Sequence, residues 1–342
     1  MQTAGVEKPR SRHGIQEMQQ MQEKESSMSL RLSAAAKTDV GKQREQNEDA
    51  SYTQVEDERG ATGLFIVSDG MGGYHAGEIA SQLAVETIRD ELQTFFGPAS
   101  TQPTVRLNNR RHKRGKGERD DPAKTRPLSA EAEENAQQQN QAIEQAAEAR
   151  EAHPTQLLGE SLVLEHYAEK LRDAVEHASA VIVKYGKTHS DAKGLGATLT
   201  AALVIEGQAF IANVGDSRTY LLHDGKLERV TRDHSLVERL VEAGQIDRED
   251  VYDHPSRNLI YRSLGAGHAE VDVDIFTEQL QPGDALLLCC DGLWEMVRDP
   301  QIEAILNDTP DAAEACDKLV DLANENGGED NITAVLVRCI GG

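Results

Sequence analysis

The sequence is poor in positive charge. Of its 342 residues, 36 are Lys or Arg and 59 are Asp or Glu, which gives a formal net charge of −23. A chain with this balance repels the phosphates of nucleic acids and anionic lipid surfaces, and it attracts cations. The composition therefore argues against a nucleic-acid-binding protein and favours a soluble protein that works with cations.

Cysteine is also scarce, and long apolar runs are absent. The four cysteines, Cys289, Cys290, Cys316 and Cys339, show no CxxC spacing. We interpret them as buried thiols in a reducing compartment. No apolar stretch approaches the ~18 residues that a membrane-spanning helix needs, and the first residues lack the apolar core of a signal peptide. The sequence thus predicts a cytoplasmic protein without a membrane span.

Two tracts lack the apolar residues of a folded segment. Residues 1–28 are rich in Gln, Glu and Met without a sustained apolar period, so we expect a disordered extension. A second polar tract, at about 97–156, carries a basic run from Arg110 to Lys116 and then an Ala-, Glu- and Gln-rich stretch. It is predicted to be a low-complexity insertion within a single domain of residues 29–342. The basic run could dock an acidic partner, but a solvated linker is the favoured interpretation.

Outside these tracts, apolar alternation predicts strands and a 3.6-residue period predicts helices. Strands are expected at about 62–68, 198–205, 208–214, 218–223, 226–231, 271–277, 284–290 and 331–338. Helices are expected at about 76–95, 158–189, 235–244, 300–307 and 311–326. Tight turns such as Asp224-Gly225 join consecutive strands, which indicates antiparallel sheets. The sequence therefore predicts an α+β fold, a four-layer α-β-β-α sandwich of two antiparallel sheets flanked by helices.

Two aspartates stand at the ends of apolar runs. Asp69 follows residues 64–68, Asp291 follows residues 285–290, and each aspartate precedes a glycine. A strand with buried aliphatic residues and a carboxylate at its tip can supply fixed oxygen ligands to a hard divalent cation. Asp-Gly is also ordinary turn chemistry. Because neither pair leads into a returning strand, we favour metal ligands over turns.

Further acidic residues recur where apolar segments meet loops, namely Glu48, Asp49, Asp216 and Asp330. Oxygen ligands without His or Cys favour Mg²⁺ or Mn²⁺ over Zn²⁺. Two such ions can share a water, lower its pKa and align it for attack on phosphorus. Arg44 would then hold the non-bridging phosphate oxygens. A surface arginine in a charged segment is the plainer interpretation of that residue taken alone.

Six short motifs carry a family resemblance. They are Gly41-x-x-Arg44-x-x-Asn47-Glu48-Asp49, Asp69-Gly70-Met71-Gly72-Gly73, Gly194-Leu195-Gly196-Ala197-Thr198-Leu199, Gly215-Asp216-Ser217-Arg218, Asp291-Gly292-Leu293-Trp294 and Gly328-Glu329-Asp330-Asn331-Ile332-Thr333. Their order is that of the metal-dependent protein phosphatases of the 2C family, and the chain resembles a bacterial member over about residues 33–96 and 160–340. The resemblance implies a β-sandwich flanked by helices and the hydrolysis of phosphoserine and phosphothreonine in proteins, in opposition to a protein kinase.

The resemblance also implies roles, position by position. The positions that match ligands of the binuclear metal centre are Asp49, Asp69, Gly70 through its backbone carbonyl, Asp291 and Asp330. Arg44 matches the phosphate-binding arginine, and Glu48 matches an acidic residue that holds metal-bound water. Asp216 matches the ligand of a third, weaker ion. The implied cofactors are two core Mn²⁺ or Mg²⁺ ions and this third ion. Residues 245–259 correspond to the flap that is thought to influence substrate choice.

Two other functions are open at this point. A catalytically inactive phosphoprotein-binding or scaffold protein of the same fold would have lost metal ligands, yet all five aspartates of the proposed set are present. A two-metal nuclease is disfavoured because the chain is acidic and its folded part shows no basic groove. We expect a monomer that binds phosphorylated proteins, including a Ser/Thr kinase and its substrates, but no nucleic acid.

The polar tract generates a first prediction. Residues 97–155 lack the apolar side chains that offset the entropy of ordering, so replacing them with a short Gly/Ser linker should preserve folding and hydrolysis of a small phosphate ester. Circular dichroism and ester hydrolysis on the shortened chain measure both properties. Loss of the folded state would reveal a structural element in the tract. Loss of activity toward phosphoproteins alone would assign docking to the basic run.

Overall fold

The computed structural model describes residues 30–56, 60–72, 76–96, 154–192, 194–267 and 270–341. The chain divides into two compact units, residues 1–96 with 168–342 and residues 97–167. The predicted extension at 1–28 and residues 97–153 of the predicted insertion lie outside the described residues. The domain boundaries therefore stay predictions, and the fold below is that of the first unit.

One sheet has five antiparallel strands in the order β1-β12-β11-β7-β8. Their bounds are β1 Leu30–Asp39, β12 Ile332–Gly341, β11 Ala285–Cys289, β7 Arg218–His223 and β8 Lys226–Arg229. The β7–β8 hairpin turns through Asp224 at φ 49° and Gly225 at φ 75°, as a type I′ turn requires. This Asp-Gly pair is thus a true turn.

The second sheet has seven strands in the order β10-β6-β5-β3-β4-β9, with β2 paired to β3. All of its pairings are antiparallel. The bounds are β10 Asp274–Gln279, β6 Gln208–Val214, β5 Leu199–Ile205, β3 Gly63–Met71, β4 Gly196–Ala197, β9 Leu264–Gly265 and β2 Asp49–Val55. Strands β3, β5 and β6 are buried along nearly their whole length, which explains their continuous apolar runs.

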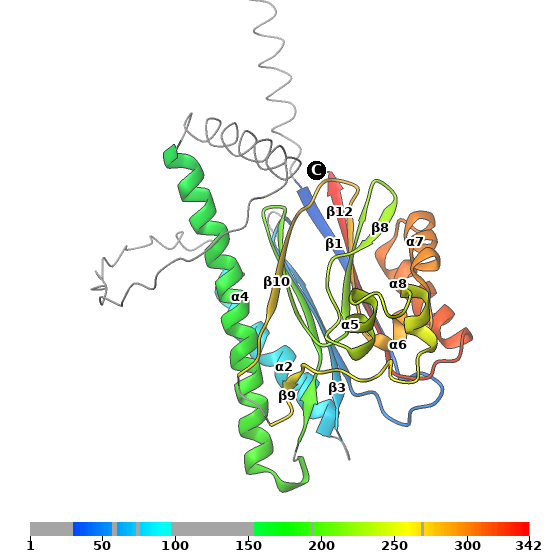
Figure 1. Cartoon of the computed structure of the whole chain (residues 1–342). Helices are drawn as coiled ribbons and strands as arrows, with labels where there is room; N and C mark the ends of the chain where they lie inside the picture. Colours follow the sequence, from blue (N-terminus) through cyan, green and yellow to red (C-terminus); the bar gives the residue numbers. More distant parts are fainter. Residues whose placement is uncertain are drawn as a thin grey trace, which may run out of the picture. The chain divides into compact units, whose positions relative to one another are not determined.

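The helices are α2 Ala76–Leu92, α4 Pro154–Thr188, α5 Leu236–Glu242, α6 Asp291–Trp294, α7 Asp299–Asp308 and α8 Ala312–Glu325, with short 3₁₀ turns η1 Gln93–Phe95, η2 Ser190–Ala192 and η3 Arg248–Asp253. Of these, α2 covers the seven-stranded sheet, and α6, α7 and α8 cover the five-stranded one (Figure 1). Helix α8 packs on β1 and β12, whereas α2 packs on β2 and β3. Among the helices of the described residues, none combines the length and apolarity needed to cross a bilayer.

Alternating side chains of the central strands fill two apolar clusters. Leu288 of β11, Val335 of β12 and Val67 of β3 belong to the cluster between the sheets. Leu287 of β11 points the other way and packs in a second cluster with Leu319 of α8. This period-2 alternation buries β11 on both faces. The predicted α+β sandwich of two antiparallel sheets with flanking helices is therefore confirmed.

A buried ion pair joins the hairpin to the helices that follow it. The Arg218 side chain is 3% exposed and that of Asp233 is 1% exposed. The guanidinium donates to both carboxylate oxygens, with Nη2 at 2.6 Å from Oδ2. The flat face of the guanidinium stacks on the Trp294 ring, with Cζ 3.4 Å from the ring centroid. Arg229 donates to Asp233 at 3.1 Å and to Glu238 of α5 at 2.6 Å, so β7, β8, α5 and α6 share one charged network.

This network generates the second prediction. Asp233→Asn should lower the free energy of unfolding by about 3–5 kcal/mol, and the melting temperature by roughly 10 °C, because the buried Arg218 charge loses its counterion. The matched control is Glu242→Gln, which removes the exposed partner of Arg232 and should cost no more than about 1 kcal/mol. Thermal unfolding of both variants makes the comparison. Equal losses would mean that burial does not decide the strength of this pair.

Candidate functional site

Two neighbouring strands of the seven-stranded sheet bring carboxylates side by side. Asp49 begins β2 and Asp69 lies near the end of β3, and the two residues are register partners. Directly opposed residues of an antiparallel pair point to the same face of the sheet. The backbone continues the pairing beyond the strand, since Gly70 N–H donates to the Glu48 carbonyl at 3.2 Å. Like charges therefore face each other at this end of the sheet.

The other sheet supplies two more carboxylates at the same end. Asp291 is the first residue of α6, immediately after β11, and Asp330 lies just before β12. Strands β11 and β12 are antiparallel neighbours, so the end of one lies beside the start of the other. The hydroxyl of Thr333 in β12 donates to Oδ2 of Asp49 at 2.6 Å, across the two sheets. The four aspartates thus gather where the sheets meet.

The glycines after Asp69 and Asp291 are required by close backbone packing rather than by turns. Neither Gly70 nor Gly292 has a φ angle in the left-handed region, in contrast to Gly225. A Cβ on Gly70 would lie 2.1 Å from the Gly77 carbonyl oxygen, and one on Gly292 would lie 2.0 Å from the Asn331 carbonyl oxygen. Both contacts are far inside van der Waals distance. Asp69-Gly70 lies within β3 and Asp291-Gly292 begins α6, so neither pair forms a hairpin turn.

Asn331 organises the loop that carries Glu48. Its Oδ1 accepts from the Glu48 N–H at 2.8 Å, and its Nδ2 donates to the carbonyls of Val40 and Gln46, each at 2.9 Å. Its own N–H donates to Asp330 Oδ1 at 2.8 Å. The Asn331 side chain therefore fixes the position of Glu48 relative to Asp330. Sequence reasoning gave it no role, although it stands inside one of the six motifs.

Asp216 joins the group through the turn between β6 and β7. Its side chain is buried, and its carbonyl accepts from Trp294 Nε1 at 3.0 Å. The hydroxyl of the adjacent Ser217 is 2.7 Å from that of Thr198, and Thr198 N–H donates to the Asp69 carbonyl at 2.8 Å. Hydrogen bonds therefore connect the Asp216 turn to the end of β3. Thr198 and Trp294 also lie within the quoted motifs, but the sequence analysis assigned neither of them a role at the site.

The carboxylates are electrostatically frustrated in the absence of a cation. Desolvation, followed by repulsion from Asp49 and Asp291, raises the pKa of Asp69 well above its ordinary value. Desolvation is also the main cause that raises the pKa of Asp49 to about 6 and that of Asp216 to about 7. The pKa of Asp291 is likewise raised well above its ordinary value, by desolvation and then by Asp216 and Glu295. These shifts mark a site that lacks positive charge.

Two oxygens at the site have no partner among the described residues. They are Oδ1 of Asp49 and Oδ1 of Asp291, both buried. A buried carboxylate oxygen without a donor is costly unless a cation or an ordered water binds it. The residues present therefore fit hard divalent cations such as Mn²⁺ and Mg²⁺.

Within the described residues, no group of three or more His, Cys, Asp or Glu side chains is arranged to hold an ion by itself.

Arg44 contacts the acidic group from the rim. Its Nη2 lies 2.5 Å from Asp330 Oδ2, and its side chain is 51% exposed. The guanidinium supplies the positive charge nearest to Asp330 and keeps donors that face solvent. An anion approaching the carboxylate group would meet this arginine first.

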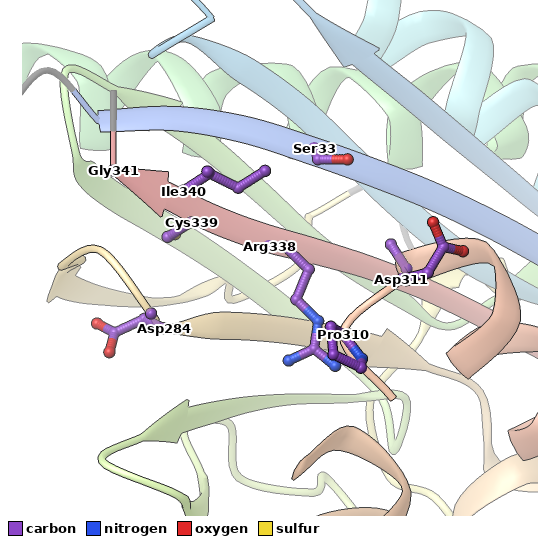
Figure 2. A pocket seen from close by; sticks show the side chains of 10 residues that line it. Ser33, Asp284, Pro310, Asp311, Arg338, Cys339, Ile340 and Gly341 are labelled. Carbon is purple, nitrogen blue, oxygen red and sulfur yellow. The ribbon is translucent and has the colours of Figure 1, made fainter. Parts of the chain in front are cut away.

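A pocket lies beside the C-terminal end of β12, away from the aspartates (Figure 2). It has a volume of about 470 Å³, and Asp284, Pro310 and Arg338 line it. Arg338 Nη2 donates to the carbonyls of Leu306 and Thr309, at 2.6 and 2.7 Å, and so caps the end of α7. This arginine has a structural task, and none of the predicted site residues lies there.

Known proteins match this chain over most of its length. The family model described as protein phosphatase 2C matches residues 41–337. The serine/threonine phosphatase Stp of Listeria monocytogenes is 33% identical over 306 residues, which are 90% of this chain and 95% of that protein. The serine/threonine protein phosphatase PstP of Mycobacterium tuberculosis is 31% identical over 90% of this chain, but the match spans only 45% of PstP.

Solved structures agree with this match. The catalytic domain of PstP in complex with two manganese ions is 29% identical, covers 91% of this chain and 99% of its own, and has a TM-score of 0.63. The serine/threonine phosphatase Stp1 of Staphylococcus aureus is 29% identical, covers 90% of this chain and 94% of its own, and has a TM-score of 0.62. The family model spans residues 41–337, and Stp is 33% identical over 90% of this chain, so this chain belongs to the protein phosphatase 2C family.

Proposed function

We propose that this protein is a metal-dependent serine/threonine phosphatase that hydrolyses phosphoserine and phosphothreonine in proteins. The observation that carries the proposal is the meeting of five aspartates at one end of the sandwich, two of which have buried oxygens without a donor. The related proteins named as serine/threonine phosphatases support it, as does the PstP catalytic domain with its two manganese ions.

The proposed ligands of the two core ions are Asp49, Asp69, the carbonyl of Gly70, Asp291 and Asp330, with Mn²⁺ or Mg²⁺ as the metal. When bound, such a pair of ions lowers the pKa of a shared water and aligns it with phosphorus. Asp216 is proposed for a third ion, because its buried carboxylate lies in the turn that Ser217 and Thr198 connect to the end of β3. Asn331 and Thr333 are proposed to hold the ligand-bearing segments in place.

The chain's own residues would bind and orient the substrate. Arg44 is exposed enough to exchange Asp330 for the non-bridging oxygens of a phosphoryl group, with which a guanidinium forms paired hydrogen bonds. Glu48 lies against the start of α2, since a Cβ on Gly77 would be 2.7 Å from its Oε2. From there it is proposed to accept a hydrogen bond from the attacking water.

A catalytically inactive scaffold of the same fold is the alternative, and nothing in the site favours it. Each position proposed as a ligand retains its oxygen atom, and the buried ones still lack compensating positive charge. We further propose a cytoplasmic monomer that opposes a Ser/Thr kinase in signalling. The scarcity of cysteine and the acidic composition support the cytoplasmic assignment.

The third prediction concerns metal dependence. Chelation with EDTA should abolish hydrolysis of p-nitrophenyl phosphate, and Mn²⁺ or Mg²⁺ should restore it. Asp69→Asn and Asp291→Asn should each lower turnover by about two orders of magnitude or more, since loss of a ligand charge leaves the water unactivated. Asp224→Asn, in the β7–β8 turn, is the matched Asp-Gly control and should keep full activity. Full activity of the chelated protein would exclude a metal mechanism.

The fourth prediction separates the third ion from the core ions. Asp216→Ala should leave the melting temperature within a few degrees of the parent, while turnover falls and the Mn²⁺ concentration for half-maximal turnover rises. Differential scanning fluorimetry and a Mn²⁺ titration on the same sample measure both. A large drop in melting temperature with normal turnover per folded molecule would instead make Asp216 a turn-stabilising residue.

A further inference from the structure

His234 forms two hydrogen bonds with the backbone of Gly215, the residue that precedes Asp216. Gly215 N–H donates to His234 Nδ1 at 2.9 Å, and His234 N–H donates back to the Gly215 carbonyl at 2.8 Å. Gly215 has a φ of +105°, and a Cβ there would lie 2.7 Å from that of Thr198. The turn therefore uses a backbone conformation and a close approach to Thr198 that suit glycine alone.

The reciprocal pair determines the tautomer of the His234 ring. Because the backbone amide of Gly215 can only donate, Nδ1 must accept, and the ring proton resides on Nε2. Nε2 lies 3.3 Å from Asp274 Oδ2, which can accept that proton, and 3.0 Å from Arg262 Nη1. Arg262 Nη1 donates to the other oxygen of Asp274 at 2.8 Å. Burial and the neighbouring Arg262 lower the pKa of His234, which keeps the ring neutral and Nδ1 free to accept.

His234 also connects the Asp216 turn to the segment after the flap. Its carbonyl accepts from Tyr261 N–H at 2.9 Å, and its ring lies 5.8 Å from the Tyr261 ring. Ser235, next in sequence, forms a β-bridge with Ile260 and caps α5. The ring is only 2% exposed, so it is wedged between the turn and this segment.

We propose that His234 is a positioning residue for Asp216. By holding the Gly215 peptide through Nδ1, it fixes the direction in which the Asp216 carboxylate enters the acidic group. The inference rests on the proposed function only in so far as Asp216 binds the third cation. His234 itself touches neither cation nor substrate; Gly215 N–H determines its tautomer, and Asp274 is the acceptor for the Nε2 proton.

The test compares two substitutions of the same ring. His234→Asn places Oδ1 where Nδ1 stood and keeps an acceptor for Gly215 N–H, whereas His234→Leu removes it. His234→Leu should raise the Mn²⁺ concentration for half-maximal hydrolysis of p-nitrophenyl phosphate about tenfold, the scale of one unsatisfied buried donor. His234→Asn should stay within about threefold of the parent. Titration calorimetry without substrate measures Mn²⁺ binding directly. The dissociation constant of the weakest Mn²⁺ site should rise by the same factor in His234→Leu.

A double substitution shows whether the effect passes through Asp216. In an Asp216→Ala background, His234→Leu should change the Mn²⁺ dependence no further, because the group that it positions is gone. If the two losses multiply, or if His234→Asn is as impaired as His234→Leu, the positioning role is overturned. If His234→Leu does not fold, Asp274→Ala provides the test. It removes the acceptor of the Nε2 proton and leaves Arg262 Nη1 facing Nε2, which favours the tautomer that cannot accept from Gly215, so the Mn²⁺ requirement should rise. A parent protein without Mn²⁺-dependent hydrolysis would overturn the proposed function instead.

Discussion

Repulsion between aspartates held at one end of the sandwich is the constraint on which the site depends. Asp49 and Asp69 face each other by strand register, and Asp291 and Asp330 approach from the other sheet. Such a group opposes folding unless counter-charge is supplied. Arg44 pairs directly with Asp330 and attracts Asp291 and Asp69 from farther away, so it offsets part of this negative charge. The rest of the fold can be understood as the rigid frame that keeps the carboxylates together despite their repulsion.

That frame is built from neutral donors near the site and from a charged network behind it. Thr333, Asn331 and Thr198 provide hydrogen bonds that place ligands without cancelling their charge. Further back, Arg218 and Asp233 neutralise each other under Trp294, whose indole N–H holds the Asp216 carbonyl. This ion pair stiffens the structure behind Trp294, whereas Arg44 pairs with one of the site aspartates, Asp330, at the rim.

The sequence predicted the two-sheet sandwich and the strands with strong apolar patterns, such as β3, β5, β6, β7 and β11. It did not predict β1 or β2, because their residues are small or polar and mostly half-buried. Both lie next to strands that supply their pairing partners, so tertiary contacts decide their conformation. The site aspartates were found because each ends an apolar run or lies within a family motif. The tasks of Asn331 and His234 depend on contacts between segments distant in sequence, which spacing cannot reveal.

All four cysteines are buried and unpaired. Burial raises the pKa of the Cys316 and Cys339 thiols to about 12, and it raises those of Cys289 and Cys290 as well. Since thiolates, not thiols, react with electrophiles and peroxides, the folded protein offers no nucleophilic sulfur at neutral pH. A cysteine introduced on the surface, for example at exposed Glu329 beside the site, would then be the preferred target for a maleimide dye. Single-site fluorescence labelling therefore does not require the four native cysteines to be replaced first.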